Sequence, residues 1–307
     1  RTMYLHSSKC MNLHDLVQKY YLSNDFNVLA EKTKHDYRYC AWTLLSTSVD
    51  NKSLMDIKLT KMTGAIARRA YEQWLSRGIY QANAITSVAR KVYSYGMEMG
   101  YAESNPFSTY KRKATHVRRT VWTKEQVVQF LDIAYSDFKY RNVGLIVQMA
   151  YEWCQRIGDM RLLQFTNIDF EKSVLNLQQS KRRSVVHLPI SLDLLKMLEQ
   201  QKEEYGFQPY VTPHYRPVRG EYKPYTLVRL SKVGRRVMDM ANLPSELRMM
   251  DLRRTGTTEM VEAGVSMGQI MSVTGHANPQ SVKPYMKNTY DSANNALTLR
   301  KTYGTSK

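Results

Sequence analysis

Apolar residues recur with a helical period over most of the chain. In the first third they predict four amphipathic helices, within residues 11–23, 33–48, 60–78 and 82–101. Thr60 is in position to be the N-cap of the third helix, and Gly78 predicts its end. The pattern stops at Asn105-Pro106. We therefore expect an all-helical first domain.

A second domain begins where helical patterns return. Thr123 and Gln126 have the spacing of a capping box, and helices are expected within residues 121–134 and 140–154. In residues 173–190, apolar and polar residues alternate on both sides of "QSKRR", which predicts a β-hairpin with a basic tip. Helical patterns follow at residues 225–243, 251–264 and 266–275. The predicted fold class is mainly α with a small β-sheet (α+β).

Between the two domains lies a basic segment without periodic apolar residues. Its cations are Lys111, Arg112, Lys113, Arg118 and Arg119. We divide the chain into a helical domain at residues 1–108, a basic linker at residues 109–120, and a second domain with a C-terminal tail at residues 121–307. Such a linker is either a solvated tether or a strap that crosses a DNA backbone.

Net charge makes nucleic acid the favoured partner. The 307 residues include 45 Lys and Arg but only 27 Asp and Glu, a formal charge of +18. The excess is +10 in residues 1–119 and +8 in residues 120–307, so it is not confined to a tail. Cations spread over a folded surface neutralise phosphates and release their counterions. The alternative is a soluble protein that is basic for no specific reason.

Composition argues against several other classes of protein. The three cysteines, Cys10, Cys40 and Cys154, are far apart and form no C-x-x-C pair, which disfavours a disulfide framework and a zinc site. No apolar run approaches the ~18 residues of a membrane span, and the first residues lack the apolar centre of a signal peptide. We expect no metal, no membrane contact and a cytoplasmic location.

Basic side chains mark two places in the middle of the chain. Arg156 is expected at the end of an apolar helix, and Asp159 follows three residues later, either to hold the arginine or as a routine surface ion pair. Lys181 stands at the hairpin tip with Arg182 and Arg183. These cations serve solubility, or they reach into a DNA groove, where a lysine can also donate a proton.

Two further places lie closer to the C-terminus. Arg253 and Arg254 begin a helix that is followed by a turn and another helix, which is also typical of a helix-turn-helix DNA-binding module without chemistry. In "VTGHANPQSVKPYMKNTY", Pro279 begins a predicted short helix, and Tyr285 lies about a turn and a half along it, nine residues after His276. A single tyrosine in such a helix is more often a core residue than a nucleophile.

Taken in order, Arg156, Lys181, Arg253, His276 and Tyr285 resemble the catalytic series of the tyrosine recombinase (phage integrase) family. The local motifs "RIGDMRLLQFTNIDF", "QSKRRSVVHLPI", "DLRRTGTT" and "TGHANPQSVKPY" are similar to that family's boxes, and "GYAESNPF" resembles the end of its core-binding domain. The resemblance covers residues 11–300. It implies an all-helical core-binding domain and a catalytic domain that form a C-shaped clamp around DNA.

The resemblance implies a reaction without metal, ATP or another cofactor. Tyr285 would attack the scissile phosphate and form a 3′-phosphotyrosyl bond, while Lys181 would protonate the departing 5′-oxygen. Arg156 and Arg253 would bind the non-bridging oxygens and stabilise the charge that builds up there. His276 would hydrogen-bond one of these oxygens.

Three further positions affect this assignment. Asp159 would orient Arg156. Met250 stands where the family usually has histidine, three residues before Arg253, and a thioether neither gives nor takes a proton. Tyr290 is the second candidate for the nucleophile.

The resemblance implies site-specific recombination or integration for a phage or mobile element. A bacterial chromosome-dimer resolvase of the same family, a type IB topoisomerase and a catalytically impaired DNA-binding relative are the alternatives. The implied partners are double-stranded DNA core or attachment sites, further copies of the chain in a tetramer on two duplexes, and an accessory DNA-bending protein, in the cytoplasm or nucleoid of a bacterial host. The residues assigned to DNA contact are Lys111, Arg112, Lys113, Arg118, Arg119, Arg182, Arg183, Arg90 and Lys91.

Overall fold

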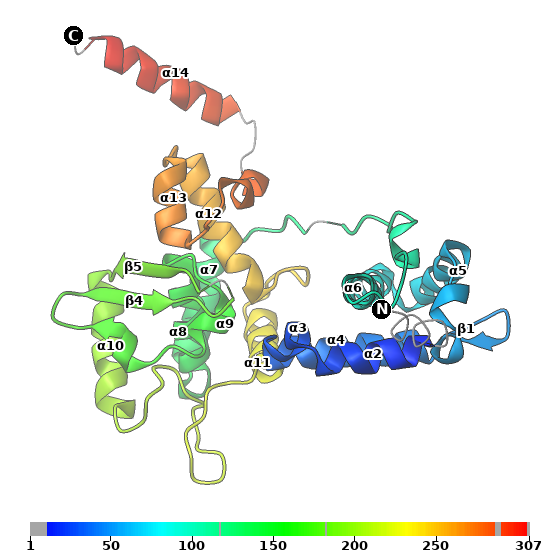
Figure 1. The fold of residues 1–307 in the computed structure, drawn as a ribbon. Coiled ribbons are helices and arrows are strands. Elements are labelled where there is room, and N and C mark those ends of the chain that lie inside the picture. The colour runs from blue at the N-terminus through cyan, green and yellow to red at the C-terminus, as the bar shows by residue number, and fades with distance from the viewer. Residues whose placement is uncertain (1–10, 117, 182, 286–289, 306–307) are drawn as a thin grey trace. The chain divides into compact units, whose positions relative to one another are not determined.

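The chain divides into two units, Arg1–Arg118 and Arg119–Lys307 (Figure 1). Each unit has its own apolar core. The computed structural model describes residues 11–116, 118–181, 183–285 and 290–305. The division falls inside the predicted linker, residues 109–120. No helix in the described part of the chain is long and apolar enough to cross a membrane.

The first unit is built around the long helix α6. Its elements are α2 (Leu13–Leu22), α3 (Asn24–Asn27), α4 (Glu31–Leu45), β1 (Ser48–Val49), β2 (Lys52–Ser53), α5 (Gly64–Trp74) and α6 (Ile79–Glu98). Helices α2, α4 and α5 pack against α6, and buried aromatic rings such as Trp74 and Phe107 fill the space between them. The four predicted helices are confirmed. The unit is not strictly all-helical, however, because β1 and β2 pair as a short antiparallel ribbon.

Thr63, not Thr60, is the N-cap of α5. Its hydroxyl accepts a hydrogen bond from the Ile66 N–H at 3.3 Å. Thr60 instead lies in the 3₁₀ turn Leu59–Lys61, whose first residue is buried in the core. The chain therefore covers the core with one extra turn before the helix starts, and the predicted cap was one turn too early.

Residues 110–116 of the predicted linker lie against the first unit. Tyr110 is only 8% exposed and belongs to that unit's core. The backbone N–H of Lys113 donates to the Tyr71 hydroxyl at 2.7 Å, and its carbonyl accepts from Asn83 Nδ2 at 2.9 Å. This stretch is therefore held against α5 and α6 and is not a free tether.

Helix α8 is the centre of the second unit. The helices are α7 (Lys124–Ser136), α8 (Phe138–Glu152), α9 (Ile157–Met160), α10 (Leu192–Tyr205), α11 (Leu227–Met240), α12 (Leu252–Glu262), α13 (Met267–Thr274) and α14 (Tyr290–Thr305). Helices α7, α9, α11 and α12 pack on α8. The predicted capping box is confirmed, since Thr123 and Gln126 exchange hydrogen bonds at the start of α7. Helix α10 was not anticipated.

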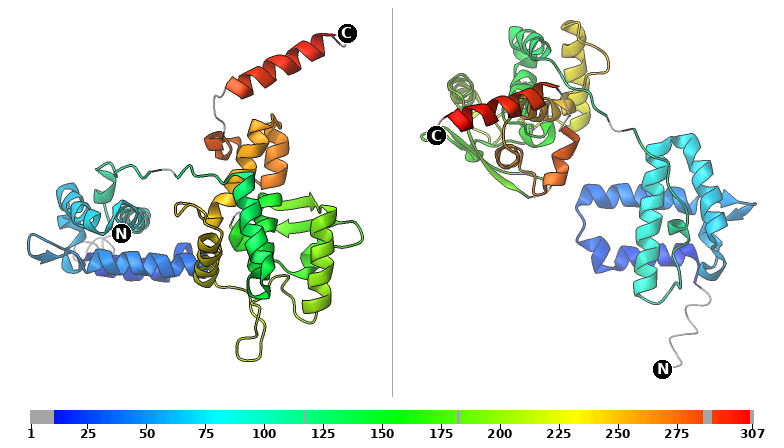
Figure 2. Two further views of the ribbon diagram at one scale, coloured as in Figure 1. Left: turned by 180° about the vertical axis from the view of Figure 1, so that it is seen from behind. Right: turned by 90° about the horizontal axis from the view of Figure 1, so that it is seen from above.

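A three-stranded antiparallel sheet adjoins these helices (Figure 1 and Figure 2). Its strands are β3 (Ile168–Asp169), β4 (Val174–Gln178) and β5 (Val185–Pro189). The predicted hairpin is β4–β5, in which the buried Leu175 and Leu177 pair with Leu188 and Val186. Helix α13 lies beside β5. The hairpin loop therefore has the C-terminal end of α13 as a neighbour.

Gly256 allows α12 to approach α8 closely. A β-carbon at this position would lie 2.5 Å from Cys154 Sγ and 3.1 Å from the Tyr151 carbonyl oxygen. The Tyr151 hydroxyl also contacts both carboxylate oxygens of Glu259, at 3.0 Å each. These contacts fix α12 against α8, and they set the place of Arg253, which lies one turn earlier on α12.

Candidate active site

Arg156 stands at the start of a helix, not at the end of one. Helix α8 ends at Glu152, and the chain then turns through Cys154, whose φ is +51°. Arg156 is the N-cap of α9, with an extended backbone. The prediction was wrong here because Trp153 and Cys154 are buried, so the apolar pattern continues past the end of the helix.

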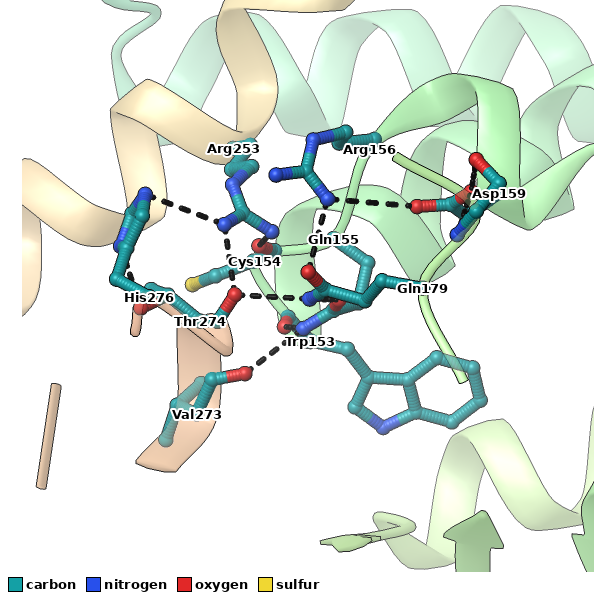
Figure 3. A network of polar contacts seen from close by, with 11 residues as sticks. Trp153, Cys154, Gln155, Arg156, Asp159, Gln179, Arg253, Val273, Thr274 and His276 are labelled. Carbon is teal, nitrogen blue, oxygen red and sulfur yellow. Dashed lines mark hydrogen bonds and ion pairs between the residues drawn. The ribbon is translucent and has the colours of Figure 1, made fainter. Parts of the chain in front are cut away.

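The guanidinium of Arg156 is held from two sides (Figure 3). Its Nη1 donates to Gln179 Oε1 at 2.8 Å and lies 3.7 Å from Asp159 Oδ2. Asp159 is 5% exposed, and its Oδ1 accepts from both the N–H and the hydroxyl of Ser180. The hydrogen-bond acceptor of Arg156 is therefore Gln179. Asp159 adds a longer ion-pair contact and fixes the hairpin loop.

Two glutamines join three separate segments of the chain. Gln179 is fully buried, and its Nε2 donates to Gln155 Oε1 at 2.7 Å and to the Thr274 carbonyl at 2.8 Å. Gln155 Nε2 in turn donates to the carbonyls of Trp153 and Val273, at 2.7 and 2.8 Å. The α8–α9 turn, the hairpin loop and the end of α13 thus share one network (Figure 3).

Neither glutamine was identified from the sequence, although a signal for Gln179 was present. Alternate residues along β4 and just beyond it point to the same, buried face, and these are Leu175, Leu177 and Gln179. A polar side chain on the buried face of a strand must form hydrogen bonds to offset the cost of its desolvation. Gln179 therefore marks the point where the hairpin meets the other segments.

Arg253 is the most deeply buried cation of this group. It is 8% exposed on the first turn of α12. Nη1 donates to the Cys154 carbonyl at 3.2 Å, and Nη2 donates to the Thr274 carbonyl at 2.6 Å and to His276 Nε2 at 3.3 Å. Among the described residues these contacts occupy three of an arginine's five N–H donors, so two remain for a ligand. Burial, together with the charge of Arg156, lowers the pKa of Arg253 to about 10, so the group is charged at neutral pH.

A left-handed glycine directs His276 into the site. Gly275 ends α13 with φ +67°, a conformation that costs glycine little. A β-carbon there would also lie 2.7 Å from Gln179 Nε2. Glycine precedes the histidine because this left-handed turn brings His276 next to Arg253 and the hairpin loop.

Hydrogen bonds determine the tautomer of His276. The Thr274 hydroxyl donates to the Ile270 carbonyl at 2.7 Å, so its oxygen accepts from His276 Nδ1, also at 2.7 Å. Nε2 then faces Arg253 as an acceptor. The Nε2 lone pair is therefore directed at the guanidinium of Arg253.

Tyr285 lies in a 3₁₀ turn and not in an α-helix. Two such turns, Pro279–Ser281 and Lys283–Tyr285, replace the predicted helix, which does begin at Pro279 as expected. Pro284 has no N–H to donate, and an α-helix through this position would lose a hydrogen bond. The tyrosine therefore ends a short, sharply turned segment.

The ring of Tyr285 lies between groups of the site. Its centroid is 6.2 Å from that of His276, and the guanidinium of Arg254 lies 5.3 Å from the ring centre. Because His276 contacts Arg253 in turn, the structure brings the predicted Tyr285, His276, Arg253 and Arg156 into one region. The side chain of Tyr290, the second candidate, lies outside what the structure describes.

Lys181 is exposed in the hairpin loop, and within the described part of the chain it makes no contact with the two arginines. The loop is closed by the Gln179 N–H donating to the Ser184 carbonyl at 2.8 Å and by the Arg183 N–H donating to the Gln179 carbonyl at 2.9 Å. Arg182 lies outside the described residues. The structure thus places Lys181 next to the site without joining it to the network.

Met250 is 67% exposed in the 3₁₀ turn Met249–Asp251. It lines a cavity of about 480 Å³ together with Lys232, Arg235 and Arg248. The residues that the structure describes contain no group of three or more side chains able to hold a metal ion.

Residues 120–292 match the family model of the phage integrase family. The chain belongs to this family. The resemblance seen in the motifs is therefore confirmed. No curated protein sequence matches the chain.

Solved structures of other integrases have the same fold. A lambda integrase dimer bound to a COC′ core site is 18% identical, with a TM-score of 0.73, over 94% of this chain and 80% of that chain. The Tn1549 transposon integrase in complex with circular intermediate DNA is 16% identical, with a TM-score of 0.75, over 94% and 99%. A lambda integrase tetramer bound to a Holliday junction is 17% identical, with a TM-score of 0.74, over 94% and 81%. The predicted fold class is confirmed.

Some residues assigned to DNA contact have partners within the first unit. Arg90 Nε and Nη2 donate to the carbonyls of Phe107 and Tyr110, at 2.7 and 2.8 Å, so this half-buried guanidinium holds residues 107–110 against α6. Its contact with DNA stays a prediction. Lys91 pairs with Asp25 at 2.9 Å. The exposed members are Lys111, Arg112, Lys113, Arg119 and Arg183, and together with Arg118 they stay predicted DNA contacts.

We expect the Gln179→Leu substitution to lower the free energy of unfolding by about 1–3 kcal/mol, because the buried Gln155 Oε1 loses its hydrogen-bond donor. Arg156 loses its hydrogen bond as well. Urea unfolding measures the change. The control is Gln178→Leu, an exposed position one residue earlier, for which a change within about 0.5 kcal/mol is expected. Equal stability of the two variants would show that the network is not structurally important.

Proposed function

We propose that the chain is a site-specific recombinase that cuts and rejoins DNA through a 3′-phosphotyrosyl bond on Tyr285. The observation that carries this proposal is the approach of the Tyr285 ring to His276, beside the buried Arg253. No carboxylate among the described residues lies within ion-pair distance of Arg253, while a second guanidinium, that of Arg156, acts on its charge. Because carboxylates do not fully neutralise the positive charge of these two arginines, the site favours an anionic ligand such as phosphate.

In the proposed reaction one bond to phosphorus forms as another breaks. The oxygen of Tyr285 bonds to the scissile phosphorus, and Lys181 donates a proton to the 5′-oxygen that leaves. The phenol proton passes to His276 Nε2, directly or through water, and the imidazolium then donates to a non-bridging oxygen. Arg156 and Arg253 stabilise the charge on these oxygens. The reverse steps rejoin a strand, so the bond energy is conserved and no ATP is needed.

The proposal extends to the partners of the chain. In the first unit, a hollow of about 680 Å³ is lined by Lys111, Arg112 and Lys113, which supports contact with a DNA backbone. We propose double-stranded core or attachment sites as the DNA partners. The relatives in solved complexes include a lambda integrase tetramer on a Holliday junction and a transposon integrase, so a tetramer serving a phage or mobile element is favoured over a chromosome-dimer resolvase. An accessory DNA-bending protein and a location at the bacterial nucleoid belong to the same proposal.

A trapped covalent adduct tests the proposal. The binding site is first selected from a library of randomised duplexes and then rebuilt with a bridging phosphorothiolate at each candidate position. Sulfur leaves without needing a proton, so the trap works whether or not Lys181 is the acid. A protein–DNA band that survives denaturation supports the proposal. Tight binding to the selected site without any adduct at any position would contradict it.

We expect the Met250→His variant to cleave faster than the natural chain, on the order of 10-fold or more, because an imidazole can move a proton and a thioether cannot. The side chain is exposed, so the substitution requires no repacking. Single-turnover cleavage measures the effect, with Met250→Leu as the control that leaves the rate unchanged. If the natural chain makes no adduct and Met250→His makes none either, a catalytically impaired DNA-binding relative becomes the better description.

A further inference from the structure

Arg254 contacts the ring of Tyr285, and nothing in the proposed reaction uses this arginine. Its guanidinium carbon lies 5.3 Å from the ring centre. Arg253, the preceding residue, is buried and donates to backbone carbonyls. Two consecutive arginines therefore have different surroundings, one inside the phosphate site and one against the tyrosine.

The guanidinium of Arg254 is half-buried beside the ring of Tyr285. Within the described parts of the chain, no carboxylate lies within ion-pair distance of this half-buried guanidinium. It lines a cavity of about 360 Å³ with Tyr285, and the cavity is bordered by two more cations, Arg119 and Lys283. A cation beside an aromatic face is attracted by the ring's quadrupole, and the attraction grows as water is excluded.

The 3₁₀ turn that carries Tyr285, Lys283–Tyr285, packs against α12, the helix that also carries Arg254. Within the described residues, the Tyr285 N–H donates to the Val282 carbonyl at 2.9 Å. This bond fixes the backbone but leaves the side-chain torsions free. Because an in-line attack needs the nucleophile within a fraction of an ångström of its place, a contact with the ring itself has a direct effect on rate.

We propose that Arg254 is a positioning residue that holds the ring of Tyr285 so that its hydroxyl faces the phosphate bound by Arg156 and Arg253. This inference rests on the proposed function, in which Tyr285 is the nucleophile. Arg254 acts through the tyrosine and does not touch the reacting phosphate. The alternative is that Arg254 binds a DNA phosphate other than the scissile one.

The first experiment compares Arg254→Met, Arg254→Lys and the control Arg77→Met, which removes an exposed cation from the first unit. Single-turnover cleavage of the phosphorothiolate duplex is measured at saturating protein, and DNA affinity is measured over a range of salt. We expect Arg254→Met to cleave about 10-fold more slowly, Arg254→Lys to recover most of the rate, and neither to change the salt dependence of binding. An unchanged rate for Arg254→Met overturns the inference. The inference is also overturned if Arg254→Met binds DNA more weakly, with a salt dependence that indicates about one phosphate contact fewer, while its cleavage rate at saturating protein is unchanged.

A second experiment reports on the ring without cleavage. Fluorotyrosine is placed at position 285, and its ¹⁹F resonance is compared between the natural chain, Arg254→Met and Arg77→Met. We expect the resonance to move only in Arg254→Met. If the natural chain forms no adduct but the resonance responds, the proposed function fails and the ring contact stands. If the adduct forms and neither rate nor resonance responds to Arg254→Met, the inference alone fails.

Discussion

We expect the Tyr285→Phe variant to form no covalent adduct with a phosphorothiolate duplex, a loss on the order of 10⁶-fold, comparable to removal of the nucleophile from other enzymes with covalent intermediates. The substitution removes one oxygen and keeps the ring. Its contacts with His276 and Arg254 are therefore retained. Affinity for DNA and the thermal midpoint should match those of the natural chain, so the lost adduct cannot be ascribed to unfolding or to weaker binding.

The matched control is Tyr290→Phe, which removes the same atom five residues later. It should form the adduct at the normal rate. If the two variants behaved the other way round, Tyr290 would be the nucleophile and the site would have to be rebuilt around it. If both variants kept the adduct, the covalent bond would not be to either tyrosine. Peptide mapping of the trapped DNA would then identify the residue.

Elements with a local signal were predicted well. The Thr123–Gln126 capping box and the β4–β5 hairpin depend on side chains within a few residues of each other, and both are present. The family resemblance likewise required only motifs in order, and the family is confirmed over residues 120–292. Where two local solutions were nearly equal, as for Thr60 and Thr63, burial of a neighbouring turn decided between them.

The parts of the site that were missed depend on contacts between distant segments. Gln155 and Gln179 are 24 residues apart, and Gln179 meets Thr274 across 95 residues. No periodicity in either segment specifies that pairing. The same holds for Arg90, because its charge is visible in the sequence but its partners, the carbonyls of Phe107 and Tyr110, lie 17 and 20 residues further along the chain.

Burying the charge of Arg253 reduces the stability of the DNA-free protein. Its folded-state pKa is lowered from 12.5 to about 10, first by desolvation and then by Arg156. A cationic group with a depressed folded-state pKa opposes folding while it is charged in both states. The penalty is therefore complete at neutral pH and is relieved only as the pH rises through about 10. A bound phosphate removes the same penalty, which links the stability of the site to its ligand.

We accordingly expect Arg253→Lys to lower single-turnover cleavage by about 10²–10³-fold, the usual cost of losing one donor to a developing oxyanion. One ammonium cannot reach the carbonyls of Cys154 and Thr274, 3.2 and 2.6 Å from the guanidinium, and the phosphate as well. The cleavage rate should show no pH dependence from this group below about pH 9, because the arginine stays charged there.

A measurement without DNA separates this role from a purely structural one. Sulfate, which resembles phosphate, should raise the thermal midpoint of the natural chain relative to chloride at equal ionic strength. At a sulfate concentration ten times its dissociation constant, the free energy of unfolding should increase by about 1.4 kcal/mol. Arg253→Met should lose this response, whereas Arg77→Met, which removes an exposed cation elsewhere, should keep it. If Arg253→Met responded to sulfate as the natural chain does, the buried guanidinium would serve α12 and the Cys154 turn, and the anion would bind elsewhere.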